Sequence, residues 1–286
     1  MRVRLDRQIS FESADVQEIM EHVSREVTLK WFDRLKPSDI DTKAHILDLV
    51  TPADREAEGV YTGLLQKLLP GSLMLGEEGS FKNGHPKLKD MSNEAPTWVV
   101  DPIDGTRNFA AHLPQFGSVV GLAYKNEFIA GFIHFPVINS TIEAARGAGA
   151  FLDGKQLLVN VRGPNGNIYG AMDTELYESK KDNLQSLDGM KLGPAIVSSI
   201  DYARMVTALR FEDAVLKQTD FVSRKPDGMK VWDHGAGTLV VREAGGIVRT
   251  WEDKEPNMDA LTDGMVAACN ENVLKRVLKA RSALVA

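Results

Sequence analysis

The chain has 286 residues, and 43% of them are hydrophobic. Its 34 Lys and Arg residues against 40 Asp and Glu residues give a formal net charge of −6. A chain of this length can bury one large core or the cores of two lobes. The negative charge gives no general attraction to nucleic acid or to anionic membrane surfaces, so we expect neither as a partner.

The N-terminus lacks the apolar core of a signal peptide, and no run approaches the roughly 18 apolar residues that a membrane helix needs. Cys269 is the only cysteine, so no intramolecular disulfide can form, and its apolar surroundings favour a buried thiol. These features together predict a cytoplasmic protein.

A first helix is predicted over residues 13–35, because apolar residues recur there at helical spacing and Ser13 can cap the first turn. We expect this helix to have a packing role. The polar segment 36–46 that follows is predicted to be a loop.

A second helix is predicted to begin at Pro52, with Thr51 as its N-cap and Asp54 in its first turn. Asp54 has a favourable place near the positive end of the helix dipole, and we interpret it as a capping residue only. Asp48 precedes the cap and is not needed for it, so its carboxylate is available for chemistry.

Two adjacent glutamates, Glu77 and Glu78, follow a short predicted strand at 73–75. From the residues alone, such a pair is more often a solvated turn than a site. The segment 80–96 is rich in Lys, Asn, Gly and Pro and is predicted to be a surface loop.

The stretch 98–109, WVVDPIDGTRNF, starts as a buried strand and stops abruptly at Asp101. Asp101 and Asp104, with the carbonyl of Ile103 between them, place three hard oxygen ligands within four residues, which suits Mg²⁺. An isolated pattern of this kind is more often a turn, so the tetrad alone does not establish a metal site.

The backbone after Asp104 can serve as a phosphate site. Gly105 relieves the steric limits where the chain turns. If a helix starts here, the N–H groups of Gly105 and Thr106 have no helical partners and can bind phosphate. A metal site and a phosphate site would then lie side by side.

The middle of the chain predicts hairpins rather than a site. Hairpin strands are predicted between 119 and 145, followed by a glycine-rich turn at 146–154. A glycine-rich loop can cradle phosphate, yet no helix start with Lys or Thr follows this one, so we favour a structural turn. His112 and His134 lack ligand-like spacing and are interpreted as structural or surface histidines.

No motif is found between 159 and 226. Beyond it, Trp232 and Asp233 open a predicted helix that ends at 245–246, and the pattern alone makes Asp233 a capping residue. A final amphipathic helix is predicted after Asn270, where it should pack on the core.

Three separated motifs resemble the signature of the inositol monophosphatase family of Mg²⁺-dependent, lithium-sensitive phosphomonoesterases. They are GEE at 76–78, the central stretch 98–109, and WDHGAG running to EAGG at 232–246. The pattern D-x-V-T-x-x-D at 48–54 also matches the family residue by residue. The resemblance therefore spans roughly Asp48 to Gly246.

The resemblance implies an α+β fold, the layered αβαβα sandwich of the sugar phosphatase and inositol monophosphatase type. It implies an N-terminal α+β lobe over 1–155 that holds most metal ligands. A C-terminal α/β lobe over 156–286 would carry the substrate-specificity region and the last metal ligand. The family is commonly dimeric, so a homodimer is expected.

The resemblance also implies two or three Mg²⁺ ions per active site. One ion would be held by Glu77, Asp101 and the Ile103 carbonyl. Another would be held by Asp101, Asp104 and Asp233. Four acidic ligands at one site repel one another strongly unless cations are present.

The remaining site residues are expected to act on water and phosphate. By resemblance, Asp48 accepts a hydrogen bond from Thr106, and this pair orients the attacking water beside Glu77. The N–H groups of Gly105 and Thr106 would bind phosphate oxygens, and Asp233 would also line the substrate site. No covalent enzyme intermediate is implied.

The substrate is predicted to be a small phosphate monoester of the inositol 1-phosphate type. Pro226 falls where inositol-cleaving members carry a glutamate, a contact that is missing here or supplied by Asp227. The run KVWDH at 230–234 looks like some 3′(2′),5′-bisphosphate nucleotidases, and histidinol phosphate and sugar phosphates also stay open. Arg224 and Lys225 could bind a second phosphate, although two basic residues are more often a solvated patch.

A catalytically silent member that binds metal or a partner protein and acts by regulation is the alternative from another class. Every ligand that the resemblance implies is present, which argues against a silent member. The sequence leaves the role of His234 open.

Overall fold

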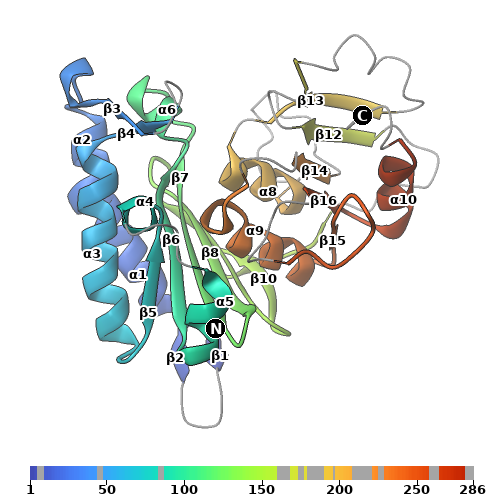
Figure 1. Cartoon of the computed structure of the whole chain (residues 1–286), viewed down its shortest axis with the longest axis horizontal. Coiled ribbons are helices and arrows are strands. Elements are labelled where there is room, and N and C mark those ends of the chain that lie inside the picture. The colour runs from blue at the N-terminus through green and yellow to red at the C-terminus, as the bar shows by residue number, and fades with distance from the viewer. Residues whose placement is uncertain are drawn as a thin grey trace.

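The computed structural model describes residues 1–4, 10–43, 48–82, 87–159, 168–172, 177–178, 190–195, 197–207, 221–224, 229–257 and 264–280. Within these ranges, helices and sheets alternate in five layers (Figure 1). The predicted αβαβα arrangement is therefore confirmed. None of the described helices is both long enough and apolar enough to cross a bilayer.

A seven-stranded sheet forms the second layer, with strand order β11-β10-β9-β8-β7-β6-β5. Its strands pair antiparallel except for β5 and β6, which are parallel. The strands are β5 (Leu73–Gly76), β6 (Thr97–Asp104), β7 (Gly117–Tyr124), β8 (Glu127–Phe135), β9 (Ser140–Ala145), β10 (Gly149–Leu152) and β11 (Lys155–Leu157). The lobe boundary at 155–156 stays a prediction, and this first sheet extends to Leu157.

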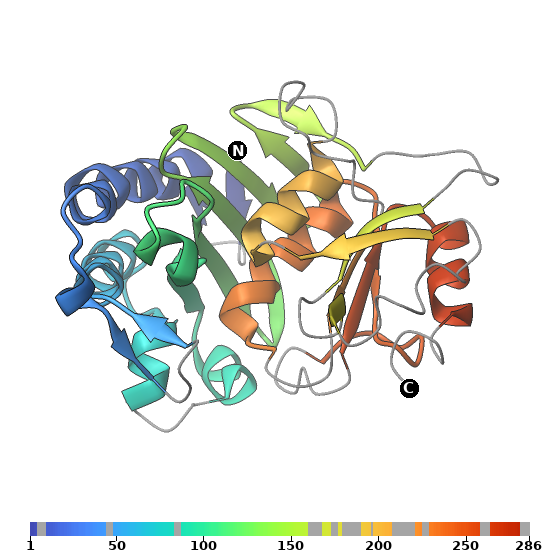
Figure 2. The same ribbon diagram turned by 90° about the horizontal axis from the view of Figure 1, so that it is seen from above.

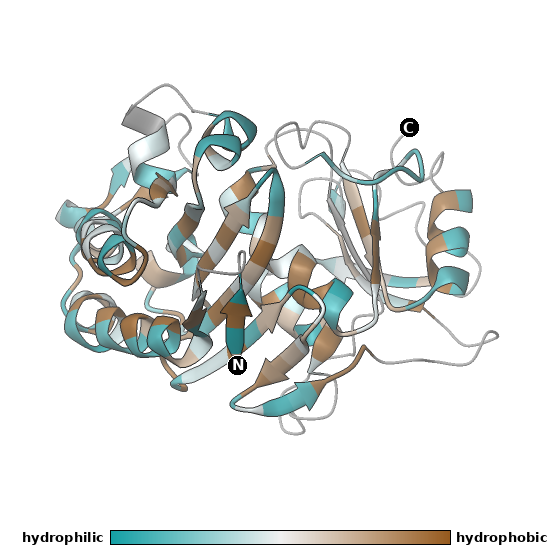
Figure 3. Ribbon diagram, turned by 90° about the horizontal axis from the view of Figure 1, so that it is seen from below, coloured by the Kyte–Doolittle hydropathy of each residue, from teal (hydrophilic) through white to brown (hydrophobic). Residues whose placement is uncertain are grey.

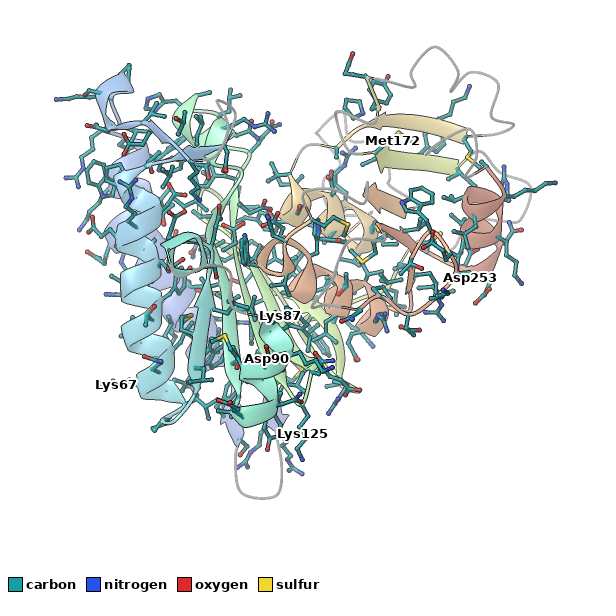
Figure 4. All side chains as sticks on the ribbon, in the orientation of Figure 1. Lys67, Lys87, Asp90, Lys125, Met172 and Asp253 are labelled. Carbon is teal, nitrogen blue, oxygen red and sulfur yellow. The ribbon has the colours of Figure 1, made fainter. Side chains whose placement is uncertain are left out.

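The outer face of the first sheet is covered by α1 (Ser13–Val23), the π-helix η1 (Ser24–Thr28) and α3 (Pro52–Leu68). Apolar side chains of α3 recur on its inner face, where Tyr61 and Leu65 pack with Trp98. The predicted first helix is thus interrupted by a π-helical turn and followed by α2 (Leu29–Phe32). Figure 4 shows Lys67, near the C-terminal end of α3, pointing away from the sheet.

The third layer consists of α8 (Ser198–Val206) and α9 (Val231–Glu243), which lie side by side between the two sheets (Figure 2). The fourth layer is a five-stranded sheet of order β13-β12-β14-β16-β15, and α10 (Glu271–Lys279) covers its far face. The strands are β12 (Ile168–Met172), β13 (Met190–Pro194), β14 (Phe221–Arg224), β15 (Ile247–Arg249) and β16 (Met265–Ala268).

The hydropathy colouring separates the faces of α10, whose buried residues include Val273 and Val277 (Figure 3). Asn270 caps this helix by accepting a hydrogen bond from the Val273 N–H at 3.0 Å, as predicted. Cys269, at the end of the preceding strand, is buried, which confirms the interpretation of its thiol.

Two segments predicted as loops contain regular structure. The segment 80–96 includes α5 (Leu88–Glu94), because Leu88 is buried and joins the core. The segment 36–46 includes the 3₁₀ turn η2 (Pro37–Asp39) and β3 (Asp41–Thr42), which pairs with β4 (Leu49–Val50). A further ribbon, β1 (Arg2–Arg4) with β2 (Ser10–Glu12), precedes α1.

Glycine allows α9 to approach the first sheet closely. A Cβ on Gly131, in β8, would lie 2.8 Å from the carbonyl oxygen of Ala236 in α9. Since real Cβ atoms do not come this close to a backbone oxygen, a side chain here would push the helix away. Helix α9, whose first turn contains Asp233, therefore packs directly against the strands of the first sheet.

Candidate active site

The buried strand β6 delivers two carboxylates at its end, as predicted, but it runs on to Asp104 instead of stopping at Asp101. The register with β7 shifts between Asp101 and Asp104. Pro102 lies at this shift, where its lack of an N–H removes one hydrogen bond of the ladder. The Asp101 carboxylate instead accepts a hydrogen bond from the Ile103 N–H at 3.0 Å, which holds the carboxylate close to its own loop.

A short helix, α6 (Thr106–Ala110), begins directly after β6. Gly105 is its N-cap and has φ +98°, a conformation that favours glycine. A Cβ at Gly105 would also lie 2.9 Å from a methyl group of Val197, at the start of α8. The helix start on which the proposed phosphate site depends is thus present at Gly105 and Thr106.

Thr106 has a carboxylate partner that differs from the one we expected. Its hydroxyl lies 3.2 Å from Asp54 Oδ1 and 3.0 Å from the Ile103 carbonyl oxygen. The other oxygen of Asp54 accepts hydrogen bonds from the N–H and the hydroxyl of Thr51, at 2.8 and 2.7 Å. The interpretation of Asp54 as a capping residue only is therefore wrong, and the role predicted for Asp48 stays a prediction.

Asp54 is almost fully buried, with 1% of its surface exposed. This burial raises its pKa to about 7, even though the hydrogen bonds from Thr51 favour the charged form. A carboxyl group with such a pKa can exchange a proton near neutral pH.

Glu77 and Glu78 open a short helix, α4 (Glu77–Lys82), rather than a solvated turn. Glu58 of α3 caps this helix by accepting hydrogen bonds from the N–H groups of Glu78 and Gly79, both at 2.7 Å. A Cβ at Gly76 would overlap the Glu58 carboxylate, so a side chain here would displace that carboxylate from the start of α4.

Lys43 is a buried cation at the site that the sequence did not single out. Its Nζ lies 2.6 Å from Glu77 Oε1 and 2.5 Å from Glu78 Oε1, and 5% of its side chain is exposed. Burial alone would lower its pKa, but the two carboxylates more than offset this effect, so the pKa is raised. The backbone N–H of Lys43 donates to the Asp48 carbonyl at 2.7 Å and extends the β3–β4 ribbon.

The other two predicted acidic ligands, Asp104 and Asp233, belong to different layers: Asp104 ends β6 of the first sheet, and Asp233 belongs to α9 of the third layer. Asp104 Oδ2 accepts a hydrogen bond from the Ser199 N–H of α8 at 2.5 Å. Asp233 lies in the first turn of α9. Burial and the negative charges of Glu77, Asp104 and Asp233 raise the pKa of Asp101 well above its ordinary value.

Four of the predicted ligands thus lie close enough for the charges of three to act on the fourth, Asp101, and we call Glu77, Asp101, Asp104 and Asp233 the acidic cluster. Their hard oxygen donors fit a divalent cation such as Mg²⁺, which would offset the mutual repulsion of the carboxylates. Among the described residues, no three His, Cys, Asp or Glu side chains already form a ready metal site. A bound cation would have to draw these ligands inward.

Other residues named from the sequence have structural places. Glu243 of α9 accepts hydrogen bonds from the N–H groups of Gly147 and Gly149 at 2.8 and 2.9 Å, which confirms that the glycine-rich segment is a structural turn. His134 is buried and its Nδ1 lies 2.8 Å from the Thr141 hydroxyl, whereas His112 is exposed. Lys225, Pro226 and Asp227 lie outside the described residues, and so does the Arg224 side chain.

The five alternating layers, with an acidic cluster where the first sheet meets α9, place the chain among layered α+β sandwich proteins. The model of the inositol monophosphatase family matches residues 12–286, and the chain belongs to this family. The resemblance drawn from the three motifs is thus confirmed. Family membership supports phosphatase activity on a small phosphorylated substrate.

Relatives of this chain carry two kinds of name. It is 30% identical over 239 residues to an inositol-1-monophosphatase of Mesorhizobium japonicum, covering 82% of each chain. It is 29% identical over 254 residues to Nus factor SuhB of Pseudomonas aeruginosa, covering 88% of this chain and 89% of that protein. The solved structure of a Thermotoga maritima IMPase shares the fold, with a TM-score of 0.78, 23% identity, and coverage of 95% and 97%.

Proposed function

We propose that the chain hydrolyses a small phosphate monoester of the inositol 1-phosphate type, with Mg²⁺ as its cofactor. The observation that supports this proposal is that the charges of Glu77, Asp104 and Asp233 act on the buried Asp101, while the Thr106 hydroxyl lies 3.2 Å from the Asp54 carboxylate. The name of the Mesorhizobium japonicum relative supports the substrate class.

The acidic cluster and the Ile103 carbonyl would hold Mg²⁺, which supplies positive charge that acidifies water and stabilises developing negative charge. Lys43 would have to share Glu77 with any such cation, because its ammonium group contacts that carboxylate. The N–H groups of Gly105 and Thr106, at the start of α6, can bind oxygens of the phosphate.

Thr106 and Asp54 are placed to orient a water molecule and take its proton. The Thr106 hydroxyl can donate to Asp54 Oδ1, which leaves its oxygen lone pairs to accept a hydrogen bond from water. As water attacks phosphorus, its proton can pass to Thr106 Oγ1 while the Thr106 proton moves to Asp54. The raised pKa of Asp54, about 7, suits it to this role of general base.

Phosphate release from a substrate panel tests the proposal. The panel contains inositol 1-phosphate, adenosine 3′,5′-bisphosphate, histidinol phosphate and fructose 1,6-bisphosphate, each with Mg²⁺, with EDTA and with added Li⁺. We expect Mg²⁺-dependent release that is fastest from inositol 1-phosphate and is inhibited by Li⁺. If another compound is hydrolysed fastest, the proposed substrate class is wrong. If none of the four compounds releases phosphate, the proposed activity is contradicted.

The name of the Pseudomonas aeruginosa relative keeps the regulatory alternative open for this chain. A purely regulatory protein would retain its role in the cell when Asp101 is changed to Asn, whereas a phosphatase would lose its role. The homodimer, the Li⁺ sensitivity and the cytoplasmic location stay predictions from the family resemblance.

A further inference from the structure

Two helices of the third layer begin at the acidic cluster and run side by side (Figure 2). The first turn of α8 reaches the cluster through Ser199, whose N–H donates to Asp104 at 2.5 Å. The first turn of α9 carries Asp233 itself. The relative position of these two helices therefore influences how Asp233 of α9 lies relative to Asp104, which ends β6 and is bonded to α8.

A buried pair of side chains joins α8 to α9 just behind the cluster. The Tyr202 hydroxyl lies 3.0 Å from His234 Nδ1, and the two rings meet edge to face with centroids 6.0 Å apart and planes at 83°. Tyr202 is 1% exposed and His234 is 3% exposed. In sequence, Tyr202 follows Ser199 by three positions, and His234 follows Asp233 directly.

Gly237 makes room for this pair. A Cβ at Gly237 would overlap the ring of Tyr202, so only glycine lets the phenol lie against α9 at this point. Gly237 follows His234 by three positions, which places both residues on the same face of α9. Tyr202 therefore contacts α9 at two successive turns of one helix face.

We propose that Tyr202 and His234 are positioning residues that fix the rotation of α9 against α8 and thereby aim Asp233 at the acidic cluster. Successive helix residues point about 100° apart, so holding His234 against α8 also sets the direction of its neighbour Asp233. Ser199 ties the same α8 to Asp104, so the pair links the placement of both carboxylates. This inference rests on the proposed function, because it assigns the pair a task at the proposed metal site.

Tyr202→Phe removes one oxygen atom and keeps the ring that packs on Gly237. The probe is Mn²⁺, whose binding to the whole protein is followed by electron paramagnetic resonance without any substrate. We expect Tyr202→Phe to weaken Mn²⁺ binding about tenfold, the size of effect seen when residues that orient metal ligands are lost. Tyr124→Phe is the matched control, because Tyr124 lies at the end of β7 and is partly exposed.

Two substitutions of His234 separate positioning from simple packing. The Asn side chain can place a hydrogen-bonding atom near the position of Nδ1, so His234→Asn should retain most of the Mn²⁺ affinity. His234→Leu fills similar space without a hydrogen-bonding atom and should weaken binding as much as Tyr202→Phe. If Tyr202→Phe and His234→Leu lower the melting temperature but leave Mn²⁺ affinity unchanged, the pair is merely structural and the inference is wrong.

The same titrations separate this inference from the proposed function. If the wild-type protein binds Mn²⁺ but releases no phosphate, the proposed activity is wrong. The Mn²⁺ affinities of the variants then still decide whether Tyr202 and His234 position Asp233. No Mn²⁺ binding by the wild-type protein would overturn both. If Tyr202→Phe does not fold, the comparison of His234→Asn with His234→Leu gives the decision.

Discussion

Asp54 serves two parts of the molecule at once, because one of its oxygens caps α3 and the other faces Thr106. Local sequence predicted the cap, since Thr51 and Asp54 are three positions apart and the motif is short-range. Thr106 is 52 positions away from Asp54, and no local pattern shows such a contact. This explains why the sequence assigned Asp54 only its structural role.

Changing Asp54 to Asn should lower kcat about 100-fold, because an amide cannot take up the proton that passes through Thr106. Asp48→Asn is the paired variant, and we expect a smaller loss from it. Both are measured as Mg²⁺-dependent phosphate release under saturating substrate. A large loss in Asp48→Asn with little loss in Asp54→Asn would return the catalytic role to Asp48.

Lys43 was the cation that sequence patterns could not assign, because its contacts with Glu77 and Glu78 come from folding of the β3–β4 ribbon. Lys43→Met removes a positive charge beside the proposed metal ligands. We expect it to tighten Mn²⁺ binding roughly tenfold, since like charges a few ångströms apart repel strongly in a buried site. The measurement is Mn²⁺ titration followed by electron paramagnetic resonance.

Lys67→Met provides the control for Lys43, because Lys67 points into solvent from α3 (Figure 4). It should leave Mn²⁺ affinity unchanged. Weaker binding in Lys43→Met would mean that Lys43 orders Glu77 for the metal rather than competing with it.

At the scale of elements, α9 was predicted close to its observed bounds because an apolar stretch ends at Gly245 and Gly246. Its close approach to β8 through Gly131 was not predicted, because the partner residue Ala236 lies in another layer. Helix α5 is likewise not predicted by the sequence, because its composition is polar. Leu88 becomes buried only through contacts with core residues from other parts of the chain.

Gly131→Ala should therefore destabilise the protein by about 1–3 kcal/mol, because the added methyl group collides with the backbone of α9. Gly63→Ala is a control for which we expect the free energy of unfolding to change in the opposite direction. Gly63 is exposed on α3 with open space around its Cα, so alanine should stabilise the helix by about 0.5–1 kcal/mol. Urea unfolding measures both, and equal effects of the two variants would contradict the close seating of α9.

At the scale of the whole molecule, buried carboxyl groups in and around the acidic cluster make stability depend on pH. Burial raises the pKa of Asp54 from 3.8 to about 7 and also raises the pKa values of Asp101, Glu58 and Glu78. A raised carboxyl pKa means that the folded state binds protons more tightly than the unfolded chain. The resulting stability is present at low pH and is lost as pH rises through about 7.

His134 acts in the opposite direction, but in a lower pH range. Burial lowers its pKa from 6.5 to about 4, so its contribution is present above pH 6.5 and is lost as pH falls towards 4. A comparison of pH 6.5 with pH 8 therefore reports mainly on the carboxyl groups.

In EDTA, we expect the free energy of unfolding to fall by on the order of 1 kcal/mol between pH 6.5 and pH 8. Mg²⁺ should stabilise the protein more at pH 8, where the carboxylates are charged. Thermal or urea unfolding at the two pH values measures this effect. Higher stability at pH 8 in EDTA would be inconsistent with a buried, mutually repelling cluster.

The layered architecture could be predicted from sequence because three separated motifs matched one family. The substrate could not, because no motif marks residues 159–226, and Asp227 lies outside the described residues. Specificity depends on contacts between segments far apart in sequence, which composition and periodicity do not encode.

Phosphate release from inositol 1-phosphate by the wild-type protein, Asp101→Asn and Asp90→Asn tests most directly whether the acidic cluster is the active site of a phosphatase. Asp101 is buried in the acidic cluster, whereas Asp90 is exposed on α5, far from α6 (Figure 4). We expect Mg²⁺-dependent release that Asp90→Asn retains and Asp101→Asn lowers about 100-fold or more. Equal release by Asp101→Asn and the wild-type protein would contradict this expectation.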